Sequence, residues 1–311
     1  MNEKLLESLN YWKKNPFSKN LKKIKQKMND NKVKRYYYIE IKDNKIKTFI
    51  PHKCQIKDVV RKEALTIFFY KILSKFKLND CFFLIIATEN YYNNYEKKND
   101  FEHFPFFIQQ KYNWSDLLLI PDAFFLNDYS KSYREKKINP DKSLHQQILN
   151  FNKNINYKDK IDKIVFRSWN KKYFPLGKLK NDHANIVSKA GGCPINHEGQ
   201  HKYKYHLSLY QRWDTIYMNL LSNSIPIIVD NKNDKNSVFN YETFYKYFIQ
   251  EGVDYIHSDI NNIEDTVKKI KKNESNYIDI SDSWKNLETK LSYDNIIDNY
   301  GHFFVEYSKL F

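Results

Sequence analysis

The sequence predicts a mixed α/β protein in which strands of largely parallel sheets alternate with helices. Short apolar runs typical of fully buried parallel strands recur along the chain, as in Phe82 to Ala87 and Leu117 to Ile120. Amphipathic stretches with helical periodicity, such as Arg61 to Phe76, lie between such runs, and this alternation is typical of layered α/β folds. At 311 residues the chain is long enough for two domains.

The N-terminal half begins with a short helix that has Leu5, Leu9 and Trp12 on one face, followed by a basic extension. Two strands of a hairpin are then predicted from Tyr36 to Ile41 and from Lys45 to Ile50, because the turn-favouring pair Asp43 and Asn44 lies between them. The amphipathic helix named above leads from this hairpin into the apolar strand at Phe82.

A polar stretch from Asn127 to Lys163 separates the two halves of the chain, and we expect the domain boundary within it. The sequence therefore predicts an N-terminal domain of residues 1–150 and a C-terminal domain of residues 151–311. Strands of the second domain are predicted at Lys163 to Phe166, Tyr203 to Leu209 and Ile225 to Val229. The last helix has an apolar face for packing, formed by Ile296, Tyr300, Phe303, Phe304, Tyr307 and Leu310.

The formal net charge is +15, from 52 lysine and arginine residues against 37 acidic ones. A positive field attracts nucleic acid, anionic membrane surfaces and phosphorylated small molecules alike, and a solvated lysine-rich surface has the same composition. Three irregularly spaced cysteines argue against a disulfide framework. No apolar run has the length of a signal peptide or of a membrane span. We therefore expect a soluble cytoplasmic protein without a membrane span, and a peripheral contact with a membrane surface stays open.

Several functional classes lose support from the motifs that are missing. The chain has only six glycines, and Gly191-Gly192 fits neither a P-loop nor a dinucleotide fingerprint, which disfavours nucleotide hydrolysis and hydride transfer. Four closely spaced side chains invite a zinc site: Cys193, His197, His201 and His206. Because this region has a single cysteine and no CxxC pair, local hydrogen bonds explain the imidazoles better, and no metal is expected.

Two predicted strand ends carry side chains suited to a ligand. Glu89 lies just past the apolar strand, at the carboxyl end where open α/β sheets gather ligands. A carboxylate there can serve as a general base, and an exposed loop acid is the alternative. Arg167 and Ser168 end a later strand, where a guanidinium and a hydroxyl can hold a diphosphate without a metal, although a surface arginine after a strand is common.

The basic and aromatic strand from His201 to His206 allows three interpretations. Alternation along a strand places Lys202 and Lys204 on one face and Tyr203 and Tyr205 on the other. Such a strand suits a nucleic-acid surface on which bases stack, one wall of a nucleotide site, or a half-buried structural strand without a ligand.

Taken in order, these segments resemble glycosyltransferase family 90, the family of protein O-glucosyltransferases and capsule-associated xylosyltransferases. The resemblance runs from the hairpin near Tyr36 to the C-terminus and so covers most of the chain. Its segments are LNDCFFLIIATEN (Leu78 to Asn90), PFFIQQKYNWSDLLLIPD (Pro105 to Asp122), KIVFRS (Lys163 to Ser168), KYKY (Lys202 to Tyr205), LLSNSIPII (Leu220 to Ile228), DYIHSDINNIEDTVKKI (Asp254 to Ile270) and the closing YSKLF.

The resemblance implies a GT-B fold, with two Rossmann-like domains facing a central cleft and a C-terminal helix that packs back on the N-terminal domain. It implies metal-independent, inverting transfer of xylose or glucose from UDP-xylose or UDP-glucose to a hydroxyl of a glycan or protein acceptor. The catalytic base of the family is an Asp just after the apolar strand, and the ungapped register puts Glu89 there. A shift of one residue puts Asn90 there instead, and an amide cannot act as a base.

The same resemblance assigns a donor site to the second domain. Arg167 and Ser168 take the diphosphate role of an FRGS-like element, which reads FRSWN here without its glycine. Tyr205, in KYKY, joins the nucleotide site. The arginine-bearing turn that follows in the family departs from its pattern here, so Arg212, the available arginine, and Trp213, as a pocket wall, are assigned in its place. A catalytically degenerate glycan-binding member and a basic nucleic-acid-binding protein remain the alternatives.

Overall fold

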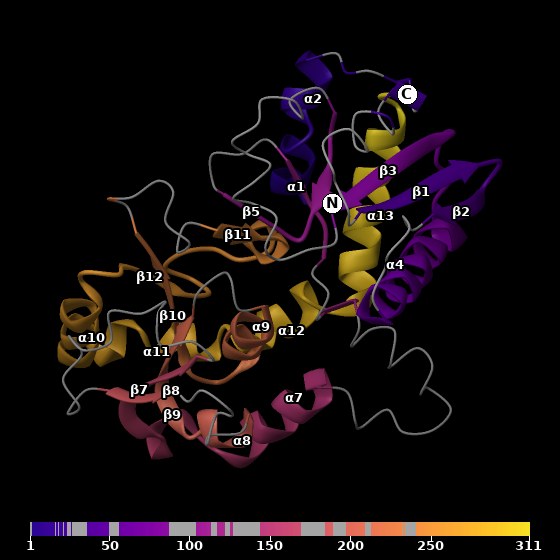
Figure 1. Ribbon diagram of the computed structural model, residues 1–311. Helices are drawn as coiled ribbons and strands as arrows, with labels where there is room; N and C mark the ends of the chain where they lie inside the picture. Colours follow the sequence, from indigo (N-terminus) through magenta and orange to yellow (C-terminus); the bar gives the residue numbers. More distant parts are fainter. Residues whose placement is uncertain are drawn as a thin grey trace. The chain divides into compact units, whose positions relative to one another are not determined.

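The computed structural model describes residues 2–15, 17, 19–20, 22–23, 26, 36–49, 56–86, 104–112, 117–121, 125–126, 144–168, 184–188, 197–208, 213–231, 233 and 241–311. The chain divides into two compact units. Unit 1 combines Met1–Arg134 with Tyr293–Phe311, and unit 2 is Glu135–Ser292. Both contain helices and a five-stranded sheet, so the mixed α/β class is confirmed (Figure 1). No helix within the described ranges is long and apolar enough to cross a lipid bilayer.

Unit 1 is built on a mixed sheet with the strand order β2-β1-β3-β4-β6. Its elements are α1 (Glu3–Glu7), α2 (Asn10–Lys14), β1 (Tyr36–Lys42), β2 (Lys45–Phe49), α4 (Ile56–Lys75), β3 (Cys81–Ile86), β4 (Phe107–Ile108), β5 (Gln110–Tyr112), β6 (Leu118–Leu119) and α13 (Tyr293–Ser308). The predicted hairpin is β1–β2, and it turns at Asp43 and Asn44, whose φ angles of 49° and 56° suit a tight hairpin turn. β1 also pairs antiparallel with β3, while β3, β4 and β6 run parallel.

Helices α4 and α13 lie side by side on one face of this sheet (Figure 1). Phe83 of β3 points to that face, where its ring lies 4.7 Å from Phe69 of α4 and 4.7 Å from Phe304 of α13. The buried Tyr307 hydroxyl donates a hydrogen bond of 3.0 Å to the main-chain oxygen of Phe82. The Tyr300 hydroxyl donates a hydrogen bond of 3.0 Å to the main-chain oxygen of Leu119. The C-terminal helix is therefore part of the core of unit 1.

Phe104 and the last residue lie against the other face of the same sheet, and the N-terminal helix α1 packs against α13. Leu5, Leu9 and Trp12 are all buried, as the pattern of the first helix predicts. The ring of Phe82, which faces away from α13, stacks on Phe104 at 5.1 Å and contacts Phe311 at 4.9 Å. Aromatic rings thus close both faces, and each buries a large apolar area.

Unit 2 is built on an all-parallel sheet with the strand order β12-β10-β9-β7-β8. Numbered along the chain, this is the order 2-1-3-4-5 of a doubly wound sheet. The elements are α7 (Leu144–Asn154), η3 (Tyr157–Asp159), β7 (Ile161–Ser168), β8 (Ala184–Ser188), α8 (His197–Gln200), β9 (Tyr203–Ser208), α9 (Trp213–Leu221), β10 (Ile225–Asp230), β11 (Tyr241–Thr243), η7 (Phe244–Tyr247), β12 (Ile256–Asp259), α10 (Ile263–Lys272), η8 (Glu274–Asn276), α11 (Ile278–Asp282) and α12 (Trp284–Lys290).

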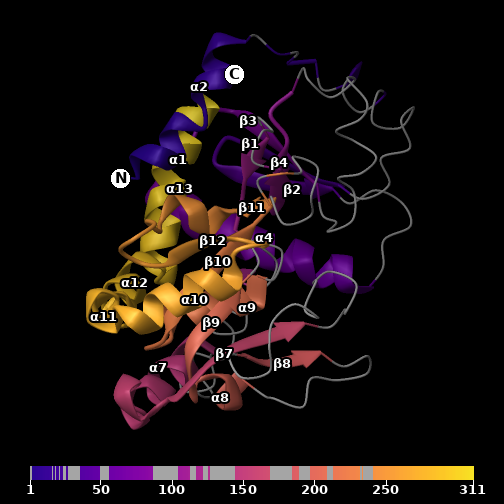
Figure 2. The same ribbon diagram turned by 90° about the vertical axis from the view of Figure 1, so that its left-hand side faces the viewer.

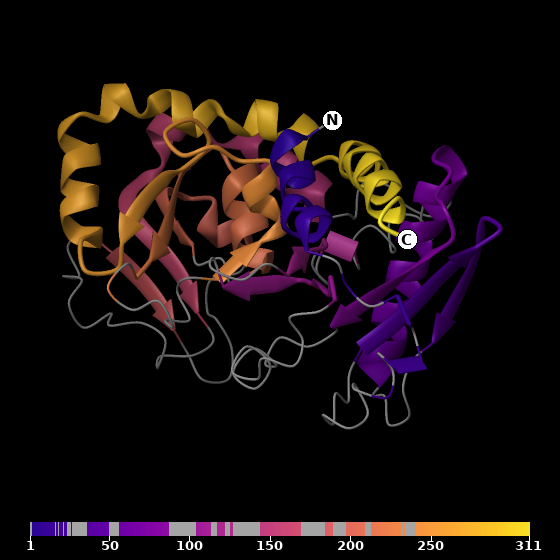
Figure 3. The same cartoon turned by 90° about the horizontal axis from the view of Figure 1, so that it is seen from above.

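Helices cover both faces of the parallel sheet. On one face lie the helices α10 and α11 (Figures 2 and 3). They close a cluster of buried side chains that we call the α10-side core. It consists of Tyr157, Ile164, Phe166, Tyr205, Leu207, Ile225, Ile227, Val229, Ile260, Ile263, Val267, Ile270 and Ile280. On the other face, Asn219 of α9 bonds to Ser208 and contacts His206, the residues of β9 that alternate with the core tyrosine and leucine. Both faces of the sheet are therefore covered by helices.

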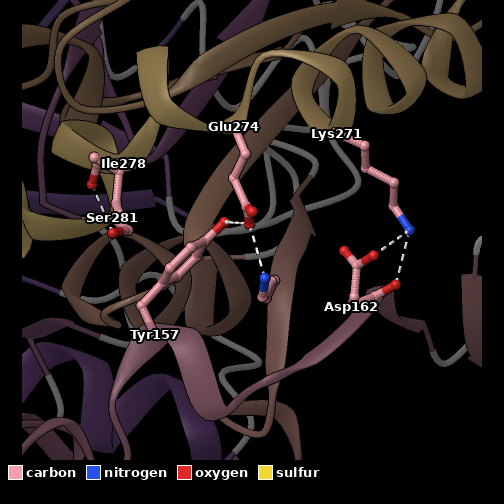
Figure 4. A network of polar contacts seen from close by, with 7 residues as sticks. Tyr157, Asp162, Lys271, Glu274, Ile278 and Ser281 are labelled. Atoms are coloured by element: carbon pink, nitrogen blue, oxygen red, sulfur yellow. Dashed lines mark hydrogen bonds and ion pairs between the residues drawn. The ribbon is translucent and has the colours of Figure 1, made fainter.

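A polar network near the amino ends of β7 and β9 ties α10 and η8 to the sheet (Figure 4). Lys271 Nζ donates to a carboxylate oxygen of Asp162 at 3.0 Å. Glu274 accepts from the Tyr157 hydroxyl at 2.9 Å and from Lys204 Nζ at 2.8 Å. The hydrogen bond from Lys204 holds the pKa of Glu274 below its usual value. These contacts are structural and lie at the end of the sheet remote from Ser168.

Lys160, just before β7, is a buried lysine that is 5% exposed. Its Nζ donates to Ser224 Oγ at 2.6 Å, and that hydroxyl donates to the main-chain oxygen of Tyr203 at 2.8 Å. Burial lowers the pKa of Lys160 to about 7, because a desolvated ammonium is disfavoured. The folded protein therefore releases this proton at a lower pH than the unfolded chain does.

We expect Gly301→Ala to destabilise the protein, although alanine normally stabilises a helix interior by about 1 kcal/mol relative to glycine. A Cβ at Gly301 of α13 would lie 2.2 Å from a carbon of the Phe76 ring. Overpacking of this kind costs roughly 1–3 kcal/mol, measurable as a lower urea midpoint. In a Phe76→Ala background the same glycine substitution should become neutral or stabilising. An equal loss in both backgrounds would contradict this packing.

Lys160→Met should change how stability depends on pH. Between about pH 7 and about pH 10 the unfolded wild-type chain holds a lysine proton that the folded protein lacks, so its free energy of unfolding rises with pH in this window. The variant should lose that rise and should gain at least ~1.4 kcal/mol, the equivalent of one pKa unit, over the wild type near pH 7. Urea denaturation across the window measures both quantities.

Lys158→Met is the matched control, because Lys158 is an exposed neighbour in η3. Its stability curve should run parallel to that of the wild type. If Lys160→Met also ran parallel to the wild type, the buried lysine would keep an ordinary proton affinity and the expectation would be wrong.

Candidate functional site

The carboxyl edge of the unit 2 sheet is where a doubly wound fold binds ligands. The strand order changes direction between β7 and β9, because β8 flanks β7 on one side and β10 flanks β9 on the other. The switch point therefore lies between the ends of these strands, at Ser168 and Ser208. β10 and β12 end on the same edge, at Asp230 and Asp259, which pair in register.

Two of the predicted donor residues have their main chain at this edge. Arg167 and Ser168 are the last residues of β7 and pair in register with Val187 and Ser188 of β8. Trp213 is the first residue of α9, the helix that follows β9. The structure thus brings these backbone positions to one edge of one sheet, while their contacts with a nucleotide stay a prediction.

The remaining predicted site residues have different positions. Glu89 and Arg212 lie outside the described residues; Glu89 follows β3 by a few positions, and Arg212 directly precedes α9. Tyr205 lies within β9 and is fully buried in the α10-side core. Burial, together with the charge of Asp162, raises its pKa, and Lys271 Nζ lies 5.7 Å from the centre of its ring. Its contacts are those of a structural residue, and a role for Tyr205 in nucleotide binding stays a prediction.

One contact at the carboxyl edge was not anticipated from the sequence. His257 Nε2 of β12 lies 2.9 Å from Asp230 Oδ2 at the end of β10. Ile256 and Val229 belong to the α10 side, so alternation turns His257 and Asp230 to the opposite face, where they meet. Their side chains are 18% and 28% exposed. We call this contact the His–Asp pair.

Of the two residues in this pair, the sequence pattern pointed only to the aspartate. Asp230 directly follows the apolar run Ile225–Val229, as Glu89 follows the run that begins at Phe82, and an acid at a strand end is a recognisable feature. The histidine gave no signal of its own, because its approach to Asp230 depends on β12 lying beside β10. That neighbourhood follows from the strand order and not from any local pattern.

The histidines considered for zinc are engaged by the protein or lie elsewhere. His206 Nε2 donates to the main-chain oxygen of Gln200 at 2.8 Å, and Nδ1 lies 3.1 Å from Asn219 Oδ1. Burial lowers the pKa of His206 well below its ordinary value, so its ring is neutral near pH 7. Cys193 lies outside the described residues. In the part of the chain that the structure describes, no three His, Cys, Asp or Glu side chains are grouped to hold a metal ion.

No protein-family model matches this sequence, and a comparison with curated proteins finds no match. The resemblance to glycosyltransferase family 90 therefore rests on the sequence segments quoted above and on the chemistry of their residues.

Proposed function

We propose that the chain is an inverting, metal-independent glycosyltransferase of the GT-B type that transfers xylose or glucose from UDP-xylose or UDP-glucose to a hydroxyl of a glycan or protein. One observation carries the proposal. The segment that resembles the diphosphate-binding element of the family, Arg167-Ser168, ends β7 at the switch point of a doubly wound parallel sheet. A nucleotide ligand binds at this position in such folds.

The proposed reaction is a direct displacement. Glu89 takes the proton of the acceptor hydroxyl, whose oxygen forms a bond to the anomeric carbon while the bond from that carbon to the diphosphate breaks. UDP leaves, and the configuration at the carbon is inverted. Arg167, Ser168 and Arg212 would stabilise the negative charge that develops on the diphosphate, and Trp213 would form a wall of the nucleotide pocket.

The topology of unit 1 supports the placement of the base in this proposal. β3, β4 and β6 run parallel, so their carboxyl ends share one edge of the sheet. Glu89 follows β3 in the chain, and β3 is buried on both faces by aromatic side chains. A residue that follows such a strand in the chain comes at the carboxyl edge, where open α/β sheets gather ligands.

Two other functions make different predictions. A nucleic-acid-binding protein is favoured by the net charge of +15, and it would bind oligonucleotides with a steep dependence on salt. A degenerate, glycan-binding member of the family is favoured by the missing glycine in FRSWN and by the early position of Arg212. Such a protein would bind without catalysing transfer.

Glu89→Gln should reduce sugar transfer by at least about 100-fold, because an amide cannot accept the proton of the acceptor. Binding of UDP should be unchanged, since the substitution leaves the diphosphate site intact. Transfer from radiolabelled UDP-xylose and UDP-glucose to a glycan panel measures the first quantity, and calorimetry the second. Glu7→Gln, at an exposed position in α1, is the control and should transfer normally. A Glu89→Gln variant as active as the wild type would remove Glu89 from the mechanism.

Thermal unfolding with candidate ligands separates the functional classes. UDP and the UDP-sugars should raise the melting temperature, since a ligand at 100 times its Kd adds about 2.7 kcal/mol to the stability of the folded state. Single-stranded oligonucleotides should give no shift at physiological salt. A shift with oligonucleotides that disappears at high salt, together with none for UDP, would favour the nucleic-acid-binding protein.

A further inference from the structure

We propose that the His–Asp pair of unit 2, His257 with Asp230, binds a sugar hydroxyl of the nucleotide-sugar. This inference rests on the proposed function and names a contact at the same edge that the sequence did not assign. The hydroxyl belongs to one of the two rings that flank a diphosphate, the ribose or the transferred sugar. Both rings offer the same chemistry, an O–H group that needs an acceptor.

The geometry of the pair shows which residue donates the hydrogen bond and which accepts it. A carboxylate only accepts hydrogen bonds, so the proton between His257 Nε2 and Asp230 Oδ2 belongs to the imidazole. In the neutral ring Nδ1 is then an acceptor, and the carboxylate fixes the tautomer and the orientation of the ring. A hydroxyl is the partner that such an acceptor selects, whereas a phosphate oxygen has no proton to donate.

Asp230 also has acceptor capacity that the described residues do not use. Within the described part of the chain, Asp230 Oδ1 is buried and accepts no hydrogen bond. Unsatisfied buried acceptors are rare in folded proteins, and each calls for a partner such as a ligand or an ordered water. A polyol ring at this edge supplies O–H groups both to the ring nitrogen and to this oxygen.

The charges along the edge place the hydroxyl-bearing ring rather than the diphosphate beside the pair. Asp230 and Asp259 end adjacent strands in register, so two carboxylates lie at the β10–β12 end of the sheet. Asp259 is held in its own turn by the main-chain N–H of Asn261, at 2.8 Å. Two carboxylates repel a phosphate, whereas Arg167 is on β7 at the other side of the switch point.

The distance from the switch point to the His–Asp pair agrees with a diphosphate at the switch point and a sugar ring at the pair. β12 is separated from β9 by β10 alone. At a spacing of about 4.8 Å between strands, the pair lies about 10 Å from the switch point. A ligand whose diphosphate lies between β7 and β9 extends over the next strands with a flanking ring, and this ring reaches Asp230 at the end of β10 and its partner His257 on β12.

His257→Gln tests the proposal, because the glutamine amide still donates to Asp230 but offers no acceptor at the position of Nδ1. Calorimetry on the full chain compares UDP, 2′,3′-dideoxy-UDP and UDP-glucose. If the ribose is bound, the variant should bind UDP about tenfold more weakly, the value of one good hydrogen bond, and dideoxy-UDP as the wild type does. If the transferred sugar is bound, affinity for UDP should be unchanged and affinity for UDP-glucose should fall.

Two further variants complete the design. Asp230→Asn should give the same selective loss, because its amide can donate to Nε2 and so favours the tautomer with a proton on Nδ1. His302→Gln is the matched control, since this exposed histidine lies on α13 of unit 1 and should leave all three affinities unchanged. Thermal unfolding of each variant without ligand verifies that it is folded.

The outcomes distinguish this inference from the proposed function. Wild-type affinity for UDP and UDP-glucose in both folded variants would overturn the inference and leave the pair as a structural link between β10 and β12. A wild-type chain that binds no nucleotide at all would overturn the proposed function. Selective loss in both variants, for one ring and not for the other, supports the inference and names the ring.

Discussion

Both faces of the parallel sheet in unit 2 are covered, and this constraint decides where polar groups can be useful. α10 and α11 close one face over an apolar core, and α9 closes the other over a buried polar cluster around His206. A parallel sheet requires such cover, because its connections place helices on its faces. Side chains in the middle of a strand pack against these helices and are buried. What remains for recognition is the line where strands end. Arg167-Ser168 lies along it, and so does Asp230, the carboxylate of the His–Asp pair.

The two ends of this sheet have opposite chemistry. Near the amino ends of β7 and β9, Lys271 with Asp162 and Lys204 with Glu274 are matched cations and anions that hold a helix in place (Figure 4). At the carboxyl end, His257 and Asp230 contact each other through Nε2 and Oδ2, and within the described residues Asp230 Oδ1 accepts no hydrogen bond. Charged side chains that pair with each other stabilise the fold, whereas side chains that can still accept a hydrogen bond are available to a ligand.

Local sequence patterns predicted the helices and strands well. They did not predict which of these elements lie next to one another. The hairpin turn at Asp43 and Asn44, the apolar strand that includes Phe83 and the stripe on α13 all follow from residue spacing. Tyr205 shows where this kind of inference ends, because alternation gives the face of a strand but not what covers that face. The approach of His257 to Asp230 could not be predicted for the same reason. It is set by the order of strands, which depends on packing over the whole sheet.

The sharing of unit 1 between two distant parts of the chain has a consequence for biosynthesis. Its core needs α13, since rings from this helix pack against Phe69 and Phe83, yet all of unit 2 is translated before α13. Unit 2 is continuous and has its own core, so it can fold while the ribosome is still working. The strands and α4 of unit 1 are made first. Until α13 is translated, the apolar face that they present to this helix stays uncovered. The strands of unit 1 are therefore made before unit 2, whereas its core is completed after unit 2 has been translated.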